Sequence, residues 1–464
     1  MAKYKAYPDY KESGVEWLGE IPQSWDVTRL KYIASIYGRI GFRGYTVDDI
    51  VGEGEGAIVL SPSNIVDEKL SLEKKTFLRW EKYFESPEII VKENDILLVK
   101  TGSTYGKSTI IMALSEPMTI NPQMALIKKI VVEPRFLAYW FNTSLIKSKI
   151  EIVNTGSGMP TMTQENINNF PVLIPPNNFD VFIADFLDHE TAKIDNLLEK
   201  QRQLIELLKE KRQAVISHAV TKGLNPDVPM KDSGVEWLGE VPEHWIVRRL
   251  KHTANLQSGI PKGKDLTGKN SISVPMLRVA NVQDGYLDLE DVHAIDIEPS
   301  QLERYLLRDG DVLMNEGGDN DQLGRGAVWT ASIDNCIHQN HVFAIRPQNI
   351  ESDWLDMLTR AAYAKFHFYR VAKQSTNLAS ISSTNIKETP LLIPPVEERM
   401  EILKFIKLQL GRLKKSEELS VNQVALLQER RAALISAAVT GKIDVRDWVA
   451  PDTQDAEEPQ EATA

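Results

Sequence analysis

The sequence has a single cysteine, Cys336, among its 464 residues. One cysteine cannot build a disulfide framework, and it excludes metal sites made of several thiolates. No run of about 18 apolar residues is present, so no membrane-spanning helix is expected. The opening residues, MAKYKAYPDYKESG, lack the apolar core of a secretory signal. We therefore expect a cytoplasmic protein.

The sequence also lacks an excess of basic residues, with 54 Lys and Arg against 65 Asp and Glu and a formal net charge of −11. Nucleic-acid-binding domains usually carry a basic surface, so this balance argues against one. Six of the acidic residues, however, lie after Arg446 in a tail without basic side chains, and residues 1–446 carry a net charge of only −5. The charge therefore disfavours nucleic acid weakly and does not exclude it.

Motifs for catalysis are scarce. The segment TGSTYGKST at 101–109 resembles a phosphate-binding loop, but its glycine spacing is one residue short. The following TIIMAL is typical of a strand, whereas phosphate binding needs a helix N-terminus there. Asp67, Glu73 and Lys75 match a nuclease triplet only loosely. We therefore predict no catalytic residue in this chain and interpret 101–109 as a glycine-rich turn that presents polar side chains.

A metal site is also disfavoured. Cys336, His338 and His341 have the pattern C-x-H-x2-H, which places three possible ligands close together. A zinc site needs a fourth ligand or a water and a suitable geometry. The corresponding stretch of the first half, IMALSEPMTINPQMA, has no such cluster. We predict no metal.

The chain is one unit of roughly 220 residues written twice. Residues 11–34 and 231–254 are identical at 16 of 24 positions, and residues 207–221 and 426–440 at 10 of 15. The segment FPVLIPP of the first half recurs as TPLLIPP in the second. This period is far too long for a solenoid, so it indicates two homologous halves, for which a pseudo-twofold arrangement is natural.

The halves match in their framework and differ in what lies between. Residues 38–155 and 258–374 share only sparse anchors, such as Asn64 with Asn281. Their short apolar runs, bounded by polar turns, predict strands, and later segments have helical spacing. We expect two strand-rich mixed α/β domains within an α+β protein. A duplicated scaffold with divergent inserts suggests one task performed on two different targets.

Each half ends in a segment that predicts a long helix. Residues 181–221 contain no proline or glycine, and a heptad repeat runs through them and through the matching segment of the second half. Such a repeat predicts a coiled-coil seam. The seam positions are Leu187, Ile194, Gln201, Leu208 and Val215 in the first helix, and Ile406, Leu413, Ser420, Leu427 and Leu434 in the second. Equal length and phase favour an antiparallel pair, although two independent amphipathic helices are an alternative.

The combination of these segments carries a resemblance. Tandem GVEWLGE-[IV]-P-x-x-W openings, LIPP turns and terminal LLxExRxAxISxAVT helices resemble the DNA-specificity subunit of type I restriction–modification systems. The likeness covers roughly residues 4–442. It implies two target-recognition domains, each reading one half of a bipartite DNA site, and two antiparallel helices that set the spacer between the half-sites. It also implies that the subunit itself is not an enzyme.

The resemblance further implies partners and their cofactors. Two methyltransferase subunits would dock on the chain, carry S-adenosylmethionine and methylate adenine at N6. Motor–nuclease subunits, which use ATP and Mg²⁺, would complete the restriction complex. This chain would hold no cofactor of its own. A weakly acidic subunit can still read DNA if its partners supply most of the phosphate contacts, which is our hypothesis for the unexpected charge.

These inferences divide the chain into five parts. We expect a first target-recognition domain over 1–178, a first spacer helix over 179–223 and a second recognition domain over 224–395. A second spacer helix over 396–442 and a disordered acidic tail over 443–464 follow.

Candidate DNA contacts are the polar and basic side chains of the two inserts, because such groups read base edges and bind phosphates. In the first insert they are Arg39, Arg43, Ser63, Asn64, Lys100, Ser103, Thr104, Lys107 and Gln123. In the second they are Lys262, Lys264, Arg278, Asn281, Asn315, Asn320, Gln322, Arg325, Gln339 and Asn340. Asn64 and Asn281 occupy equivalent places and are equally typical of turn caps.

Two other classes of function remain as alternatives. A self-contained DNA methyltransferase or nuclease would need a cofactor or metal motif, which the sequence does not display. A protein–protein scaffold built on the coiled coil would not require two divergent inserts.

Overall fold

The computed structural model describes residues 4–153, 161–261, 270–318, 323–374 and 379–449. The chain forms two compact units, Met1–Gln201 with Gln423–Ala464 (unit 1) and Arg202–Asn422 (unit 2). Each unit is a mixed α/β domain with one end of each long helix, which confirms the predicted fold class. No helix among the described residues has the length and apolar character needed to cross a membrane.

The two long helices are α5 (Phe179–Lys222) and α10 (Val396–Val439), each of 44 residues. At 1.5 Å per residue each is about 66 Å long. Gly223 and Gly441 follow them with φ of +76° and +70°. Glycine adopts this left-handed conformation without strain, and the resulting turn ends a helix.

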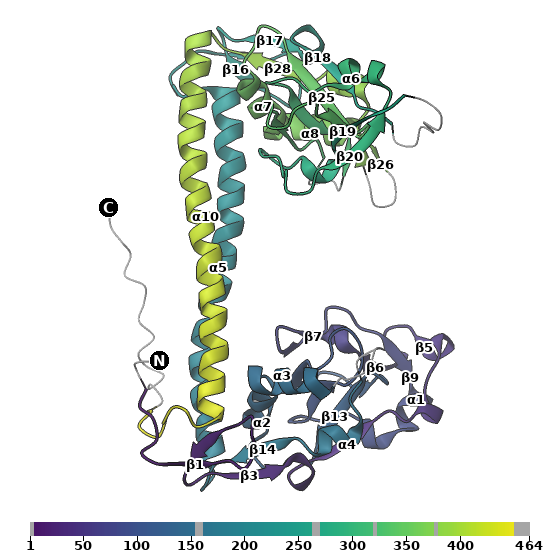
Figure 1. The fold of residues 1–464 in the computed structure, drawn as a ribbon, viewed down its shortest axis with the longest axis vertical. Helices are drawn as coiled ribbons and strands as arrows, with labels where there is room; N and C mark the ends of the chain where they lie inside the picture. Colours follow the sequence, from purple (N-terminus) through teal and green to yellow (C-terminus); the bar gives the residue numbers. More distant parts are fainter. Residues whose placement is uncertain (1–3, 154–160, 262–269, 319–322, 375–378, 450–464) are drawn as a thin grey trace. The chain divides into compact units, whose positions relative to one another are not determined.

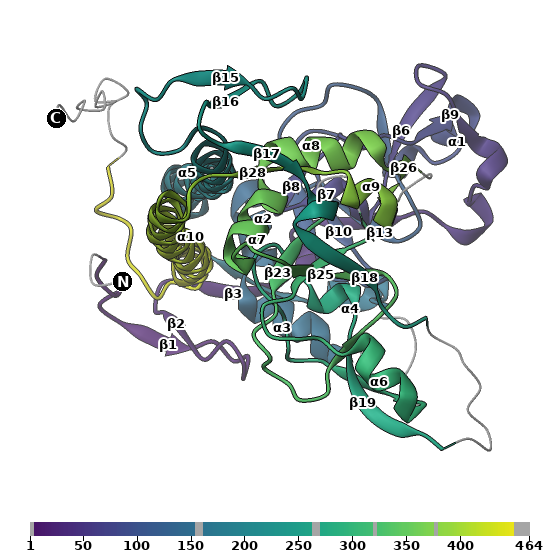
Figure 2. The ribbon, with the colours of Figure 1, turned by 90° about the horizontal axis from the view of Figure 1, so that it is seen from above.

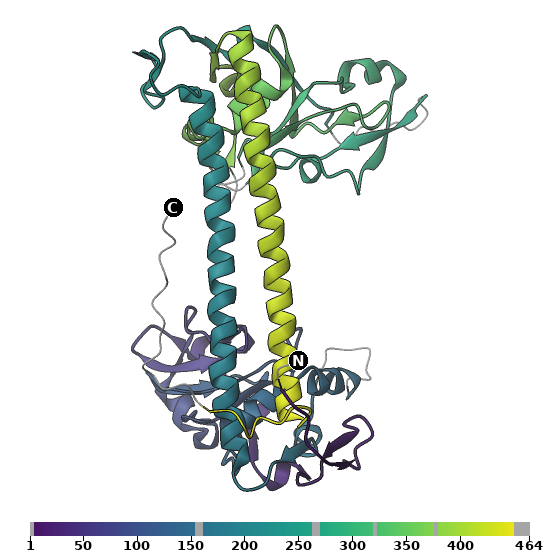
Figure 3. The same cartoon turned by 90° about the vertical axis from the view of Figure 1, so that its left-hand side faces the viewer.

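Opposite ends of the two helices pack together within each unit. In unit 1, Ile183 and Leu187 near the start of α5 share a core with Ile435 near the end of α10. In unit 2, Val220 near the end of α5 shares a core with Ile402 near the start of α10. Both contacts require the helices to run in opposite directions, as predicted, and Figures 1 and 3 show this in each unit.

None of the ten predicted seam positions is fully exposed. Leu187, Ile194, Ile406 and Ser420 are buried, and the other six are partly buried. The detailed coiled-coil register remains a prediction.

The described residues of unit 1 form two four-stranded sheets and three two-stranded ones. The first four-stranded sheet is antiparallel, in the order β11 (Ser108–Ile110), β10 (Ile96–Val99), β13 (Met124–Lys128) and β4 (Ser35–Gly38). The second has the order β12 (Met118–Ile120), β6 (Gly56–Leu60), β9 (Phe77–Arg79) and β5 (Ile50–Val51). The pairs are β1 (Tyr10–Glu12) with β2 (Glu20–Pro22), β3 (Asp26–Arg29) with β14 (Pro171–Ile174), and β7 (Ile65–Val66) with β8 (Lys69–Leu70).

Unit 2 repeats this plan. Its antiparallel sheet has the order β18 (Ala254–Ser258), β25 (Val342–Pro347), β21 (Val312–Asn315) and β23 (Gly326–Val328). A second sheet joins β20 (His293–Ile297), β19 (Ile272–Leu277) and β24 (Ile337–His338). The pairs β15 (Met230–Asp232) with β16 (Glu240–Pro242) and β17 (Ile246–Arg249) with β28 (Pro390–Ile393) correspond to β1–β2 and β3–β14. A small sheet of β22 (Gly317–Gly318), β27 (Ala379–Ser380) and β26 (Lys373–Gln374) completes the unit.

Short helices cover these sheets. In unit 1 they are α1 (Trp80–Phe84), α2 (Pro134–Phe141), α3 (Ser144–Val153) and α4 (Gln164–Asn168). In unit 2 they are α6 (Pro299–Tyr305), α7 (Ser352–Arg360), α8 (Ala362–Val371) and α9 (Ser383–Lys387).

The repeated tryptophans form the joint between sheets and helices. Trp25 and Trp245, from the P-x-x-W motifs, are fully buried. Trp140 of α2 and Trp354 of α7 donate their indole N–H to the carbonyl oxygens of Pro171 and Leu392, at 3.0 and 2.9 Å. A buried indole N–H needs such an acceptor. In each unit the repeated P-x-x-W motif and a helix of the divergent insert therefore share one core with α5 and α10.

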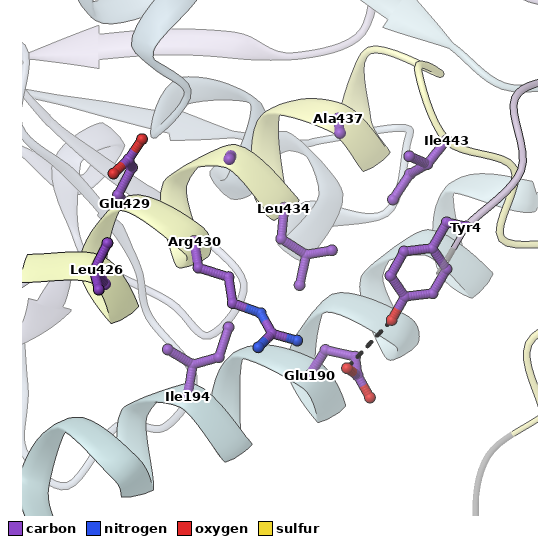
Figure 4. A pocket seen from close by; sticks show the side chains of 10 residues that line it. Tyr4, Glu190, Ile194, Leu426, Glu429, Arg430, Leu434, Ala437 and Ile443 are labelled. Atoms are coloured by element: carbon purple, nitrogen blue, oxygen red, sulfur yellow. Dashed lines mark hydrogen bonds between the residues drawn. The ribbon is translucent and has the colours of Figure 1, made fainter. Parts of the chain in front are cut away.

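The two ends of the described chain meet in unit 1. The Asp444 amide donates to the Lys5 carbonyl at 2.7 Å, and the Tyr10 hydroxyl donates to the Gly441 carbonyl at 3.0 Å. The β1–β2 hairpin thereby lies beside the end of α10 (Figure 2). Tyr4 reaches across the helix pair to Glu190, beside a groove of about 480 Å³ (Figure 4).

Residues 443–449 differ from the predicted tail. Ile443 and Val445 are buried in the core of unit 1, and Trp448 packs edge-on against Phe182 and Phe186. Their apolar side chains supply the reason, because they extend the hydrophobic surface beyond the end of α10.

An ion-pair cluster fastens the β7–β8 hairpin of unit 1 to both helices. Arg431 of α10 donates to Glu68 in the hairpin turn at 2.8 Å and to Asp195 of α5 at 2.9 Å. Burial alone would raise the pKa of Glu68, but the contacts with Lys147 and Arg431 outweigh it and lower that pKa. Glu68 has a φ of +64°, which non-glycine residues rarely adopt, so the cluster holds a strained turn in place.

In unit 2, an arginine of a long helix also binds the corresponding turn, but with different partners. Arg212 of α5, which matches Arg431 in the repeat, donates to the backbone carbonyl of Asp284 at 3.2 Å. Arg360 of α7 donates to the Asp284 carboxylate at 2.8 Å. The next residue, Gly285, has a φ of +86°, and a Cβ there would lie 2.5 Å from the Arg360 guanidinium. In both units an arginine of the helix pair therefore holds the same turn.

Replacing Arg431 with Ala should destabilise unit 1. Glu68 and Asp195 would lose their shared cation while staying about three-quarters buried, which costs roughly 1–3 kcal/mol. The measurement is the urea midpoint of the purified chain, compared with Arg412→Ala, an exposed arginine of the same helix. Equal midpoints for the two variants would contradict a clamping role for Arg431.

Candidate nucleic-acid interface

The parallel strands β6 and β12 bring three loops of unit 1 together. Because β6 and β12 run in the same direction, the turns that follow them leave the sheet at one edge. The Asn121 amide donates to the Leu60 carbonyl at 2.9 Å, and the Lys100 amide donates to the Gln123 carbonyl at 2.9 Å. The segments 61–64, 100–107 and 121–123 therefore form one continuous rim, which we call rim 1.

The loop of residues 100–107 is the glycine-rich turn predicted between two strands. It connects β10 to β11, so a strand follows Lys107 where phosphate binding would need a helix. Gly106 has a φ of +83°, and the Tyr105 hydroxyl donates to the Ile150 carbonyl at 3.1 Å. These contacts anchor the loop on α3.

Rim 1 presents six of the nine predicted contact residues at or near the surface. They are Ser63, Lys100, Ser103, Thr104, Lys107 and Gln123. Lys100 is partly buried beside the backbone of Gly38, and this burial lowers its pKa. Ser63 and Ser61 share a hydrogen bond of 2.8 Å between their hydroxyls. The rim can therefore offer both donors and acceptors to a polar ligand.

Unit 2 has the same backbone frame at the corresponding place. Strands β19 and β24 are parallel, and the Gln339 amide donates to the Leu277 carbonyl at 2.9 Å. The Glu316 amide donates to the His341 carbonyl at 2.9 Å, as the Lys100 amide does to Gln123 in unit 1. We call the described segments 278–281, 316–318 and 339–341 rim 2.

The side chains on this shared frame differ. Lys100 of rim 1 corresponds to Glu316 of rim 2, and Gln123 corresponds to His341. A constant backbone with exchanged polar groups can present two different patterns of donors and acceptors from one kind of scaffold.

Two predicted contact residues of unit 1, both arginines, take part in its internal structure. Arg39 is 4% exposed and donates to the Ile120 carbonyl and the Thr119 hydroxyl, both at 3.0 Å. Arg43 forms an ion pair with Glu88 at 3.3 Å. Burial lowers the pKa of Arg39, and its hydrogen bonds support β12 beneath the rim. Arg39 therefore has no surface to offer a ligand, contrary to the expectation from its residue type.

Asn64 and Asn281 have the turn-capping role that was the alternative for them. The Asn64 amide donates to the carbonyls of Ser71 and Lys74 at 3.0 and 2.9 Å, and its Oδ1 accepts from the Ser61 amide. Asn281 makes the equivalent bonds to Asp288 and Asp291. Both side chains are buried, with every hydrogen-bonding group of the amide in use.

Asn315 and the two arginines of unit 2 are also engaged internally. Asn315 is fully buried and donates to the Val282 carbonyl at 3.0 Å, so it offers no surface. Arg278 pairs with Asp291 at 2.9 Å, and Arg325 donates to Gln283 at 3.1 Å. Gln339 and Asn340 lie partly exposed on rim 2. The predicted residues Lys262, Lys264, Asn320 and Gln322 lie outside the described residues.

Sequence reasoning missed Glu316 as a rim residue and considered His341 only as a metal ligand. The His341 Nδ1 lies 2.8 Å from a Glu316 oxygen, with both side chains partly exposed. A signal was available in the anchors of the two halves. Aligning Asp95 with Asp311 places Lys100, a predicted contact, opposite Glu316.

The possible metal ligands of unit 2 do not converge. Cys336 is buried, which raises the pKa of its thiol to about 12, and burial lowers the pKa of His338. The His338 Nδ1 contacts the Val342 carbonyl at 2.7 Å, while His341 lies on the rim. Over the parts of the chain that the structure covers, no three His, Cys, Asp or Glu side chains are grouped to hold a metal ion.

Comparisons with known proteins agree on one family. Residues 81–207 match the model of the type I restriction modification DNA specificity domain. The chain is 23% identical to the type I restriction enzyme EcoKI specificity subunit of Escherichia coli K12, over 66% of this chain and 65% of that protein. It is 21% identical to the StySPI specificity subunit of Salmonella potsdam, over 84% of this chain and 82% of that protein.

A solved structure has the same fold. A protein chain from a study of complex assembly and conformational transition in the type I R-M system superposes with a TM-score of 0.61. The match covers 91% of this chain and 99% of that one, at 16% identity. In its sequence and its tandem repeat the chain is thus similar to the type I restriction–modification specificity subunits, and it shares its fold with the chain of that solved structure.

Proposed function

We propose that this chain is the DNA-recognition subunit of a type I restriction–modification system, in which each recognition domain reads one half of a bipartite DNA site. The observation that carries the proposal is the pair of rims, which have one backbone frame and different polar side chains. Two such rims suit a site with two unlike halves. A coiled-coil scaffold would gain nothing from this divergence.

The chain would act as a reader and not as an enzyme. We propose that two methyltransferase subunits dock on it, supply S-adenosylmethionine and methylate adenine at N6. Motor–nuclease subunits with ATP and Mg²⁺ would complete the restriction complex, in the cytoplasm where the DNA lies. Exposed leucines on the long helices, such as Leu204 and Leu207 of α5 and Leu408 and Leu419 of α10, support a protein-docking role for these helices.

We propose the domain division on the same basis. Residues 1–178 and 224–395 would be the recognition domains, and 179–223 and 396–442 the spacer helices. The acidic tail would begin after the packed segment 443–449.

Contacts with DNA, either to bases or to phosphates, are proposed for the surface residues of the two rims. In rim 1 they are Ser63, Lys100, Ser103, Thr104, Lys107 and Gln123, and in rim 2 they are Gln339 and Asn340. Arg43, Arg278 and Arg325 could join them only by exchanging an internal partner for DNA.

Exchanging residues 38–155 for those of a relative with another specificity should change one half-site only. The second recognition domain and both long helices lie outside this segment, so the second half-site and the spacer should be unchanged. Modified-base sequencing of host DNA would show both half-sites and the spacer together. An unchanged methylation motif would favour the scaffold alternative.

Lengthening both helices by one heptad should lengthen the spacer and leave both half-site sequences unchanged. Seven residues add about 10.5 Å, the rise of roughly three base pairs. The insertions belong after Gln201 in α5 and after Asn422 in α10, where the chain divides between the two units. The control has the heptad in α5 alone, which breaks the pairing and should abolish methylation. Changed half-sites with the original spacer would refute the proposal that the helices set the spacer.

Replacing Lys107 with Gln should weaken binding of the assembled complex to all DNA sequences alike. A lost phosphate contact lowers the slope of the logarithm of affinity against the logarithm of salt concentration by about 0.9. The matched control is Lys92→Gln. Lys92 is also exposed, but it precedes β10, whereas Lys107 lies in the loop that follows this strand. Salt titrations that give equal slopes for the two variants would remove Lys107 from the interface.

A further inference from the structure

In rim 2, the side chains of Asn340, His341 and Glu316 are linked in a row by hydrogen bonds. The His341 Nδ1 lies 2.8 Å from the Glu316 Oε2, and the Asn340 Nδ2 lies 3.3 Å from the His341 Nε2. The Glu316 side chain is 30% exposed and that of His341 is 55% exposed. A carboxylate is thus held at the surface that we assign to DNA, where phosphates would repel it unless it meets a hydrogen-bond donor.

We propose that Glu316 is a specificity-determining residue of the second recognition domain and reads the amino group of a cytosine in the second half-site. The inference rests on the proposed function, because it assigns a base to a rim that is itself proposed to read DNA. It adds the chemistry of the contact.

The chemistry of the carboxylate selects the base. An ionised carboxylate only accepts hydrogen bonds, and in the major groove only cytosine N4 and adenine N6 donate them. Adenine places its N7 acceptor beside N6, where a second carboxylate oxygen would face a lone pair. Cytosine presents its donor without such an adjacent acceptor. Guanine and thymine present acceptors there and would be repelled by the carboxylate.

His341 positions the carboxylate. With the Asn340 amide nitrogen as donor, the His341 Nε2 accepts and its Nδ1 carries the proton that is donated to the Glu316 Oε2. Within the described residues, no hydrogen bond reaches the Glu316 Oε1. One oxygen is therefore fixed by the protein, and the other remains available as the acceptor for a base.

Rim 1 provides the contrast on the same frame. Lys100 and Gln123 replace Glu316 and His341, while the backbone bond between the two positions is 2.9 Å in both units. A lysine donates to the O6 and N7 acceptors of guanine. The corresponding position of the first half-site should therefore be a guanine.

The test uses the complete complex with its methyltransferase subunits and a randomised DNA library, selected by binding and sequenced. With Glu316→Gln, the preference for cytosine at one position of the second half-site should fall by about tenfold or more, because glutamine pairs with adenine. The first half-site and the spacer should be unchanged. The control is Asp334→Asn. Asp334 is an exposed carboxylate that precedes β24, whereas rim 2 follows this strand, so the base preference should be unchanged at every position of the motif.

A second variant tests the same assignment from the other unit. Lys100→Glu combined with Gln123→His should convert the guanine preference of the first half-site toward cytosine at the matching position. His341→Gln should weaken the cytosine preference less than Glu316→Gln does, since histidine acts through Glu316.

The outcomes separate the inference from the proposed function. A Glu316→Gln complex that unfolds at the wild-type temperature and selects the wild-type motif overturns the inference alone. A uniform loss of binding at all positions overturns it as well, because a base contact acts at one position. A wild-type complex that selects no bipartite motif overturns the proposed function itself.

Discussion

The packing of opposite ends of α5 and α10 is the constraint on which each unit depends. Unit 1 is completed by the last turns of α10, which lie more than 200 residues from the start of α5. Unit 2 likewise needs the end of α5 against the start of α10. Neither half of the sequence can bury its own core alone, because each supplies an apolar helix face to the other. The repeat is therefore preserved where it meets these helices.

The arginines at the matching positions 212 and 431 extend the same constraint to the domain surface. Each reaches from a long helix to a turn that contains a residue with positive φ, Glu68 in one unit and Gly285 in the other. The turns differ in sequence but are held at the same place. The attachment to the helices can stay the same while the side chains of the rims differ, because the two features involve different loops of each domain.

The sequence predicts best what is local or repeated, and this separates the fold from the site. Heptads and the duplicated motifs predicted the helices and their direction, since a period is visible in the chain itself. Arg39 illustrates the limit, because only the distant strand β12 provides the carbonyl and hydroxyl that bury it. Glu316 and His341 meet across 25 positions through the pairing of β21 with β25, which residue type alone does not reveal. Asn64 was ambiguous for the same reason.

The acidic net charge is compatible with DNA recognition once two tasks are distinguished. One is binding the phosphates, which holds the duplex, and the other is recognising the bases, which reads it. Holding a duplex requires several cations against phosphates and makes affinity strongly dependent on salt. Reading requires a few donors and acceptors in fixed positions. The rims contain such groups, including a carboxylate that would be unfavourable in a surface evolved mainly for phosphate. An acidic subunit with precise rims therefore fits a complex in which the partners supply most of the phosphate contacts and this chain supplies the discrimination.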